Sequence, residues 1–76
     1  MEQTPAETTA GAVRAELARK RITGRQMARD LGWSVTPTHY RITGKYPFTI
    51  DQLVAIADYL QVPLVSLLPA DRSAAS

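Results

Sequence analysis

The sequence predicts an all-α fold, a compact bundle of about five short helices that contains a helix-turn-helix pair. Apolar residues recur three and four positions apart in successive segments, as they do on one face of a helix. Each segment is also bounded by a capping residue, a glycine or a proline. At 76 residues the chain has room for one domain, which buries only about 60% of the surface that the unfolded chain would expose.

The first helix is expected from about Thr9 to Lys20, because Val13 and Leu17 are spaced by four and lie on the same side as small alanines. We expect residues 1–7 to form a flexible N-terminal tail, residues 8–69 the helix-turn-helix domain, and residues 70–76 a flexible C-terminal tail. Both tails are rich in Ala, Ser and Thr and offer little surface to bury.

The second helix is expected at about residues 24–31. Thr23 and Gln26 can form a capping box, in which the side-chain oxygen of each residue accepts a hydrogen bond from the backbone N–H of the other. Met27 and Leu31 then fall on one helix face with Ala28, and Gly32 supplies the left-handed conformation that ends a helix.

The third helix is expected at about residues 35–43, with Ser34 or Thr36 as its cap. Pro37 is tolerated there because the first-turn N–H groups have no partner within the helix. Gly44 lies where a C-terminal cap belongs. Two short helices joined by a turn of three or four residues match the helix-turn-helix motif, whose second helix lies in the DNA major groove.

The fourth helix begins with a second capping box, Thr49 and Gln52, and Phe48 and Leu53 are spaced as a hydrophobic staple. Its apolar stripe is Leu53, Ile56, Ala57 and Leu60. Gln61-Val62 should end it, after which Pro63 can open a fifth, short helix that stops at Pro69.

The net charge is only +2, but it is unevenly distributed. Residues 14–45 hold eight basic and two acidic side chains, a net charge of +6, whereas residues 1–13 and residues 46–76 each carry −2. Positive charge is therefore confined to the segment with the helix pair, as a phosphate-facing surface requires.

Other functions find little support. There is no cysteine, and His39 is the only histidine, so we expect no metal site. No glycine-rich phosphate loop or base-supported nucleophile is present, so we expect neither an enzyme nor a cofactor nor a small-molecule ligand. No apolar run reaches the ~20 residues of a membrane span, and no signal peptide is evident. These features indicate a cytoplasmic protein that does not contact the membrane.

The stretch from about Val13 to Pro69 resembles the phage repressor and Cro-like (lambda-repressor-like, XRE-type) helix-turn-helix family. The resemblance rests on Ile22-Thr23, Met27-Ala28, Leu31-Gly32, Ser34, Gly44-Lys45, Ile56-Ala57, Leu60, Val62 and Leu67-Leu68-Pro69. The interval from Gly32 to Gly44 is also usual in that family.

The resemblance implies that residues near the start of the third helix, and one turn further on, contact base edges. By position these are Val35, Thr36, His39 and Tyr40. Val35 and Thr36 suit the methyl group of thymine, and His39 or Tyr40 can donate to an acceptor such as guanine N7. Arg41 would join them if its side chain swings toward a guanine.

A larger set of residues is expected to contact DNA phosphates, and these contacts would supply most of the nonspecific affinity. The set is Arg19, Lys20, Arg21, Thr23, Arg25, Ser34, Lys45 and Tyr46.

Three positions depart from the family pattern. Gly24 stands where a phosphate-contacting Gln is frequent, so this contact would pass to Arg25. Thr38 and Arg41 occupy positions that are more often apolar, which indicates a rotated helix or burial of Tyr40 and Ile42 instead. Pro37 could shift the start of the third helix by two residues.

The sequence therefore predicts a double-stranded DNA-binding transcriptional regulator, most plausibly a phage-type or prophage-type repressor that occludes a promoter. An antitoxin-like protein-interaction module and an excisionase-like recombination factor are the alternatives. A homodimer through the fifth helix and C-terminal region, and a monomer on an asymmetric site, both remain open. Trp33 is expected to pack in the core, and Tyr59 either to half-cover it or to lie at a subunit interface.

Overall fold

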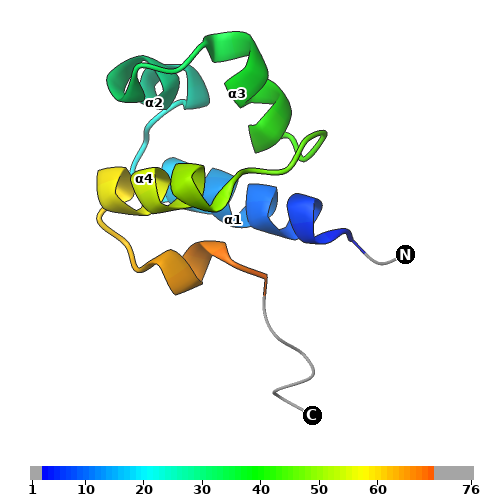
Figure 1. Ribbon diagram of the computed structural model, residues 1–76. Helices are drawn as coiled ribbons and strands as arrows, with labels where there is room; N and C mark the ends of the chain where they lie inside the picture. Colours follow the sequence, from blue (N-terminus) through cyan, green and yellow to red (C-terminus); the bar gives the residue numbers. More distant parts are fainter. Residues whose placement is uncertain (1–2, 70–76) are drawn as a thin grey trace.

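The computed structural model describes residues 3–69 as four α-helices followed by a 3₁₀-helix (Figure 1). The elements are α1 (Pro5–Arg19), α2 (Gly24–Leu31), α3 (Val35–Ile42), α4 (Ile50–Leu60) and η1 (Leu64–Leu67). Residues 3–69 contain no strand, in agreement with the predicted all-α class. None of the helices in this range is long and apolar enough to cross a membrane.

The helices form layers. Helices α1 and α4 lie side by side in the middle, α2 and α3 lie together on one side of them, and η1 lies on the opposite side (Figure 1). Helix α3 also packs against α1, and η1 packs against both α1 and α4. This arrangement leaves one face of the α2–α3 pair turned away from the rest of the molecule.

The core lies between the layers and takes side chains from every element. Its buried members are Val13, Leu17, Met27, Ile42, Leu53, Ile56, Ala57, Leu60 and Leu67. Trp33 and Phe48 are partly buried and pack against this cluster. Trp33 therefore packs against the core, as expected, but at its edge.

Helix α1 begins at Pro5, four residues before the predicted start near Thr9. Thr4 and Glu7 form a capping box, in which Thr4 Oγ1 accepts from the Glu7 N–H at 3.1 Å and Glu7 Oε1 accepts from the Thr4 N–H at 2.8 Å. Pro5 occupies the first helical position, where its missing N–H costs nothing. Residues 5–7 of the expected N-terminal tail thus belong to the helix, and the expected tail at residues 70–76 lies outside the described residues.

Helix α2 has only half of its predicted capping box. Thr23 Oγ1 accepts from the Gln26 N–H at 3.0 Å, but the Gln26 side chain donates to Asp30 at 2.8 Å instead of reaching back to Thr23. The other Asp30 oxygen accepts from the Tyr59 hydroxyl at 2.5 Å and so joins α2 to α4. This hydrogen bond, with partial burial and the negative charge of Asp30, raises the pKa of Tyr59 to about 12.

Helix α4 follows the prediction at both ends. Thr49 and Gln52 form the complete capping box, with distances of 2.8 and 3.0 Å. Gln61 ends the helix in the left-handed conformation, with φ 60°. Tyr59 is half-buried and packs against the core. This agrees with the expectation that it half-covers the core.

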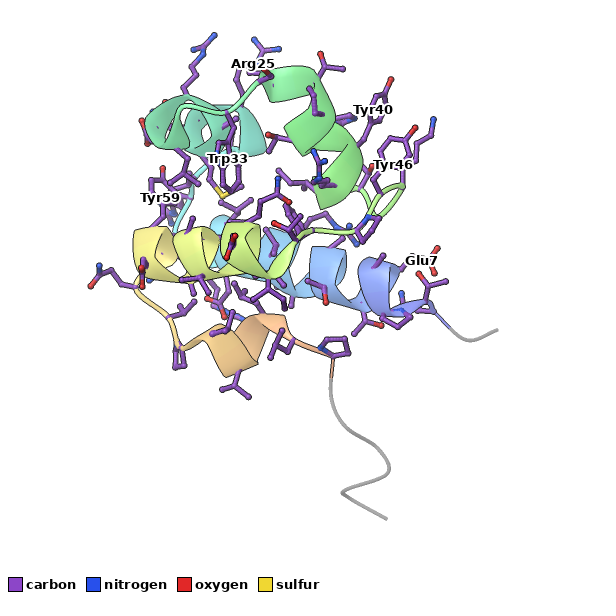
Figure 2. The ribbon with its side chains drawn as sticks, viewed as in Figure 1. Glu7, Arg25, Trp33, Tyr40, Tyr46 and Tyr59 are labelled. Atoms are coloured by element: carbon purple, nitrogen blue, oxygen red, sulfur yellow. The ribbon has the colours of Figure 1, made fainter. Side chains whose placement is uncertain are left out.

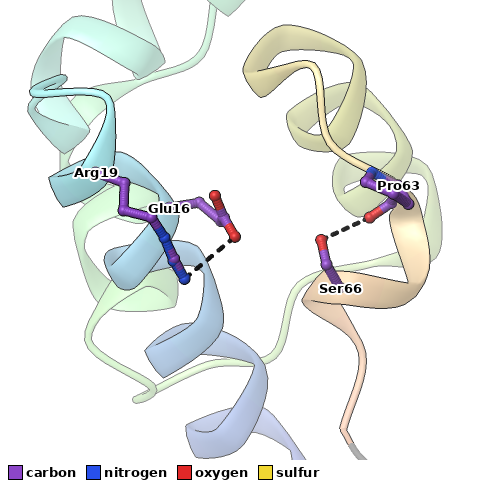
Figure 3. Close-up of polar contacts among 4 residues, drawn as sticks. All are labelled: Glu16, Arg19, Pro63 and Ser66. Carbon is purple, nitrogen blue, oxygen red and sulfur yellow. Dashed lines mark hydrogen bonds and ion pairs between the residues drawn. The ribbon is translucent and has the colours of Figure 1, made fainter.

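The predicted fifth helix is only a short 3₁₀-helix, η1. Pro63 precedes it in an extended conformation and does not open an α-helix. Its carbonyl accepts from the Ser66 hydroxyl at 2.7 Å (Figure 3). The few residues between Pro63 and Pro69 leave little room for the i→i−4 hydrogen bonds of an α-helix, so the tighter i→i−3 form results. Leu67 still reaches the core.

Candidate nucleic-acid interface

The turn between α2 and α3 is built by Gly32. Its φ of 74° lies in the left-handed region, and the N–H of Trp33 returns to the carbonyl of Ala28 at 2.7 Å. Such a closure satisfies carbonyls at the end of α2 and reverses the chain direction. Helix α3 then begins at Val35, so Pro37 falls inside its first turn and does not delay its start.

Ser34 is the N-terminal cap of α3, but its side chain makes no capping hydrogen bond. Its carbonyl instead accepts from the Thr38 hydroxyl at 2.8 Å. Thr23 occupies the equivalent position before α2, where its hydroxyl oxygen accepts from the Gln26 N–H. Both hydroxyl-bearing residues therefore stand at helix N-termini, where backbone N–H groups and the helix dipole favour anions.

Helix α3 has two distinct faces. Thr38 and Ile42 are buried against the body of the domain, with exposed fractions of 4% and 9%. Of the two residues considered for burial in place of Thr38 and Arg41, only Ile42 is buried, because Tyr40 is 37% exposed. Thr38 fits in an apolar setting because its hydroxyl is satisfied within the helix by Ser34.

The outer face of α3 and the start of α2 enclose a groove of about 500 Å³, which we call the α2/α3 groove. Its lining residues are Arg14, Gly24, Arg25, Val35, Thr36, His39, Tyr40, Ile42 and Thr43. Four of the five predicted base-contacting residues, Val35, Thr36, His39 and Tyr40, thus line one groove together. Among the lining residues none is acidic, and two are arginines.

Arg25 lies at the N-terminal end of α2, where α2 and α3 approach each other (Figure 2). It is the predicted phosphate-contacting residue that lines the groove. Asp30, the acidic residue of α2, is engaged by Gln26 and Tyr59 and is absent from the groove lining. The groove therefore presents positive charge and hydroxyl groups without a competing carboxylate.

Gly24 and Arg14 also line the groove, and neither was predicted as a site residue. A Cβ added at Gly24 would come within 2.7 Å of Cδ1 of Ile42, so glycine allows the start of α2 to approach α3 closely. The Arg14 guanidinium donates to the carbonyl of Ile42 at 2.7 Å and so binds the end of α3 to α1. A cation at a helix C-terminus is also favoured by the helix dipole.

Ile42 and Thr43 also line the groove, and neither was predicted as a site residue. A signal for Thr43 exists, since it follows His39 by four residues and so continues the same helix face. Arg14 offers no such signal, because the residue whose carbonyl it binds lies 28 positions away.

Arg41 lies outside the α2/α3 groove. Its Nη1 approaches the carbonyl of Pro37 at 3.4 Å, and its Nε is buried with no hydrogen-bond partner among the described residues. A base contact by Arg41 therefore requires the side chain to leave this position.

Lys45 and Tyr46 lie in the turn after α3, beyond Thr43 and Gly44, and are exposed, Tyr46 by 49%. Tyr46 lies beside Tyr40 at the C-terminal end of α3 (Figure 2), with ring centroids 5.8 Å apart. These two predicted phosphate-contacting residues thus adjoin the outer face of α3.

The remaining predicted phosphate contacts, Arg19, Lys20 and Arg21, lie at the end of α1 and do not line the groove. Arg19 forms an ion pair with Glu16 at 3.4 Å (Figure 3). Arg21 adopts a left-handed conformation with φ 57° in the connection to α2.

Comparisons with known proteins agree with this fold. The family model described as the BetR domain matches residues 5–76. No curated protein matches the sequence.

Three solved structures are similar over most of their length. The DNA-binding domain of BldD from S. venezulae has a TM-score of 0.73 at 21% identity, covering 86% of this chain and 97% of that one. A crystal structure of the DNA-binding domain of BldD gives 0.75 at 21% identity, covering 91% and 100%. The hypothetical transcription factor NHTF from Neisseria gives 0.81 at 19% identity, covering 99% and 86%. At these identities the similarity establishes the fold.

Proposed function

The chain belongs to the BetR domain family, and from that membership and the geometry of α3 we propose that it is a sequence-specific, double-stranded DNA-binding transcriptional regulator. The observation that carries the proposal is the α2/α3 groove, in which Val35, Thr36 and His39 on the outer face of α3 meet Arg25 with no acidic residue in the lining. The solved structures with the same fold include two DNA-binding domains and a hypothetical transcription factor, which supports the same reading.

In this proposal α3 enters the major groove and reads base edges. Val35 and Thr36 contact thymine methyl groups, and the Thr36 hydroxyl adds a hydrogen bond. His39, one turn further on, donates to an acceptor on guanine. Arg41 contributes to recognition only after its side chain leaves the carbonyl of Pro37.

Phosphate contacts come from the two ends of the helix pair. Arg25 and the Thr23 hydroxyl serve at the start of α2, where the backbone N–H groups also favour an anion. The Ser34 hydroxyl makes no capping bond and so can donate to a phosphate oxygen. Lys45 and Tyr46 bind the backbone beyond the other end of α3. Arg19, Lys20 and Arg21 would join only if the DNA extends past the groove toward the end of α1.

A repressor of the phage type is the more specific form of the proposal: the bound domain occupies operator DNA and excludes polymerase. We also propose that two copies pair through η1, where Val65 is 73% exposed, and occupy two half-sites. A symmetric pair reads half-sites that are about one helical turn apart. Replacing Val65 by lysine should then convert a dimer to a monomer in sedimentation equilibrium without changing the half-site that is read.

The deciding experiment is selection of bound sequences from a random duplex pool at about 150 mM salt, where nonspecific phosphate binding is weak. We expect one enriched motif, palindromic for a dimer or single and asymmetric for a monomer. His39→Ala should relax the preference at one position of the motif, whereas Arg25→Ala should weaken binding to all sequences alike. A pool without any enriched motif would contradict sequence-specific recognition.

A further inference from the structure

The backbone carbonyl of Tyr40 organises the turn that follows α3. It accepts from the backbone N–H of Lys45 at 2.9 Å, from the Thr43 hydroxyl at 3.0 Å and from the backbone N–H of Tyr46 at 3.4 Å. Gly44 permits this tight turn, because its φ of 91° lies in a region that residues with a Cβ rarely adopt. The turn from Thr43 to Tyr46 is therefore folded back onto a single residue of α3.

The side chain of Tyr40 continues the same arrangement. The Lys45 ammonium lies 4.8 Å from the centroid of the Tyr40 ring and 6.0 Å from that of Tyr46. The two tyrosine rings meet edge to face, with an interplanar angle of 89°. We call these three residues the Tyr40–Lys45–Tyr46 cluster, and Figure 2 shows its two tyrosines next to each other at the end of α3.

These contacts change what Tyr40 can contribute. Its ring already attracts the Lys45 ammonium through a cation–π interaction. An exposed lysine side chain otherwise samples many rotamers, and the entropy lost when binding orders this side chain reduces the affinity. A lysine held against a ring has less freedom left to lose when it meets an anion.

We propose that Tyr40 is a positioning residue, whose ring holds Lys45 in place for a DNA phosphate at the end of α3, and that it does not itself read a base. This inference rests on the proposed function. The Tyr40–Lys45–Tyr46 cluster then supplies the sequence-independent part of DNA binding, and Val35, Thr36 and His39 supply the sequence-dependent part.

The test is a set of four variants, Tyr40→Phe, Tyr40→Leu, Lys45→Gln and the double Tyr40→Leu/Lys45→Gln, with binding measured on the selected duplex and on a shuffled duplex over a series of salt concentrations. Tyr40→Phe keeps the ring and should bind both duplexes as the wild type does. Tyr40→Leu should weaken both by the same factor, several-fold. The double variant should bind no more weakly than Lys45→Gln alone, because the ring acts only through the lysine.

Two results would overturn the inference while the proposed function stands. One is a change in the preferred base when Tyr40→Phe removes only the hydroxyl. The other is a double variant whose loss of affinity equals the product of the losses in Tyr40→Leu and Lys45→Gln, since the two side chains would then act independently. If the wild type itself prefers no duplex over another, the proposed function fails and this inference fails with it. The wild-type measurement therefore separates the two failures.

A measurement on the free protein keeps the inference testable even if Tyr40→Leu does not fold. Protons on the terminal methylene groups of Lys45 should be shifted upfield in the NMR spectrum by the ring current of Tyr40, in the wild type and equally in Tyr40→Phe. Lys45 shifts at the random-coil value in the wild type would show that the ring does not hold the lysine and would overturn the proposal.

Discussion

Gln61 ends α4 with φ 60°, in a conformation that its Cβ makes unfavourable. Helix α2 ends in the same conformation, but with Gly32 in the corresponding position. Glycine has no such penalty because it lacks a Cβ. The two helices thus use one C-terminal geometry at different local cost, and the cost at Gln61 is about 1 kcal/mol.

Gln61→Gly should therefore increase the free energy of unfolding, by up to about 1 kcal/mol after the greater flexibility of glycine in the unfolded chain is counted. Denaturant unfolding followed by circular dichroism would measure it. Gln61→Ala is the matched control, since it removes the side-chain hydrogen bond to the carbonyl of Asp58 but keeps the strained backbone. A Gln61→Gly variant no more stable than Gln61→Ala would contradict strain at this position.

Tyr59 should make stability depend on pH. Its folded pKa of about 12 exceeds the ordinary value of 10.0, mainly because the hydroxyl donates to Asp30. A pKa raised by folding contributes stability that is fully present below about pH 10 and is lost as the pH rises toward 12. Tyr59→Phe should thus be less stable than the wild type at pH 8, by about 1 kcal/mol at most because solvent screens the exposed hydrogen bond. This difference in stability should shrink above pH 10.

Urea unfolding of both proteins between about pH 8 and 11 would measure this convergence. Tyr46→Phe is the control, because the Tyr46 side chain is 49% exposed and its hydroxyl makes no bond like that of Tyr59 to Asp30 within residues 3–69. If wild type and Tyr59→Phe stay equally far apart at every pH, the hydroxyl of Tyr59 is not bound to Asp30 in solution.

At the scale of elements, two glycines with left-handed backbones hold α3 between its neighbours, and they differ in their surroundings. A Cβ on Gly32 would meet nothing within 4 Å, whereas a Cβ on Gly44 would come within 3.3 Å of the backbone of Glu7 in α1. Only Gly44 therefore combines a special conformation with close contact between elements.

Replacing each glycine by alanine should separate these two effects. Gly32→Ala should destabilise by about 1 kcal/mol through backbone strain alone. Gly44→Ala should cost about 2 kcal/mol or more, because α1 must also move away from the turn. Thermal unfolding of the pair would decide, and equal losses would show that α1 does not press against Gly44.

The predictability of each element follows from how local its determinants are. The α2–turn–α3 unit was predictable because Thr23, Gly32 and the apolar spacing act within a few residues. The start of α1 was missed because its capping box, Thr4 with Glu7, precedes the apolar periodicity that marked the helix. The Gln26 side chain bonds to Asp30 and not to the Thr23 N–H, because Asp30 lies one turn away and is held in place by Tyr59 from α4.

The candidate site divides in the same way. Val35, Thr36, His39 and Tyr40 were expected from the family resemblance, by their positions in the third helix, and these residues do line one groove. Arg14 and Gly24 depend on contacts with Ile42 that form only when the helices pack. The link between Tyr40 and Lys45 depends on the fold of an irregular turn, which side-chain spacing along a helix does not describe.

For the whole molecule, the distribution of charge gives the domain an electrical polarity. The segment with a net charge of +6 contains α2 and α3, whereas residues 46–76, with a net charge of −2, contain α4 and η1. The acidic residues Asp51 and Asp58 belong to α4, and η1 carries no charge, so the side of α4 that holds α2 and α3 (Figure 1) is the one that attracts a polyanion.

Binding to duplex DNA should accordingly be steeply salt-dependent. About six phosphate contacts would lower the affinity roughly a thousandfold between 50 and 200 mM salt. Arg25→Ala should flatten the logarithmic salt slope by about one unit. Arg19→Ala removes the same charge from a residue outside the groove that is paired with Glu16, and should change the slope less. Equal slopes for both variants would indicate that net charge, not contact, sets the affinity.

The separation of faces on α3 has a consequence for how this domain could acquire new targets. Thr38 and Ile42 carry the packing of the helix, while Thr36 and His39 are exposed on the other side and contribute nothing to the core. Substitutions at the exposed positions are therefore nearly free of folding cost and can drift or be randomised. If the proposed function is right, a library limited to Thr36 and His39 would keep the scaffold intact, and selection from it could change the DNA sequence that the domain prefers.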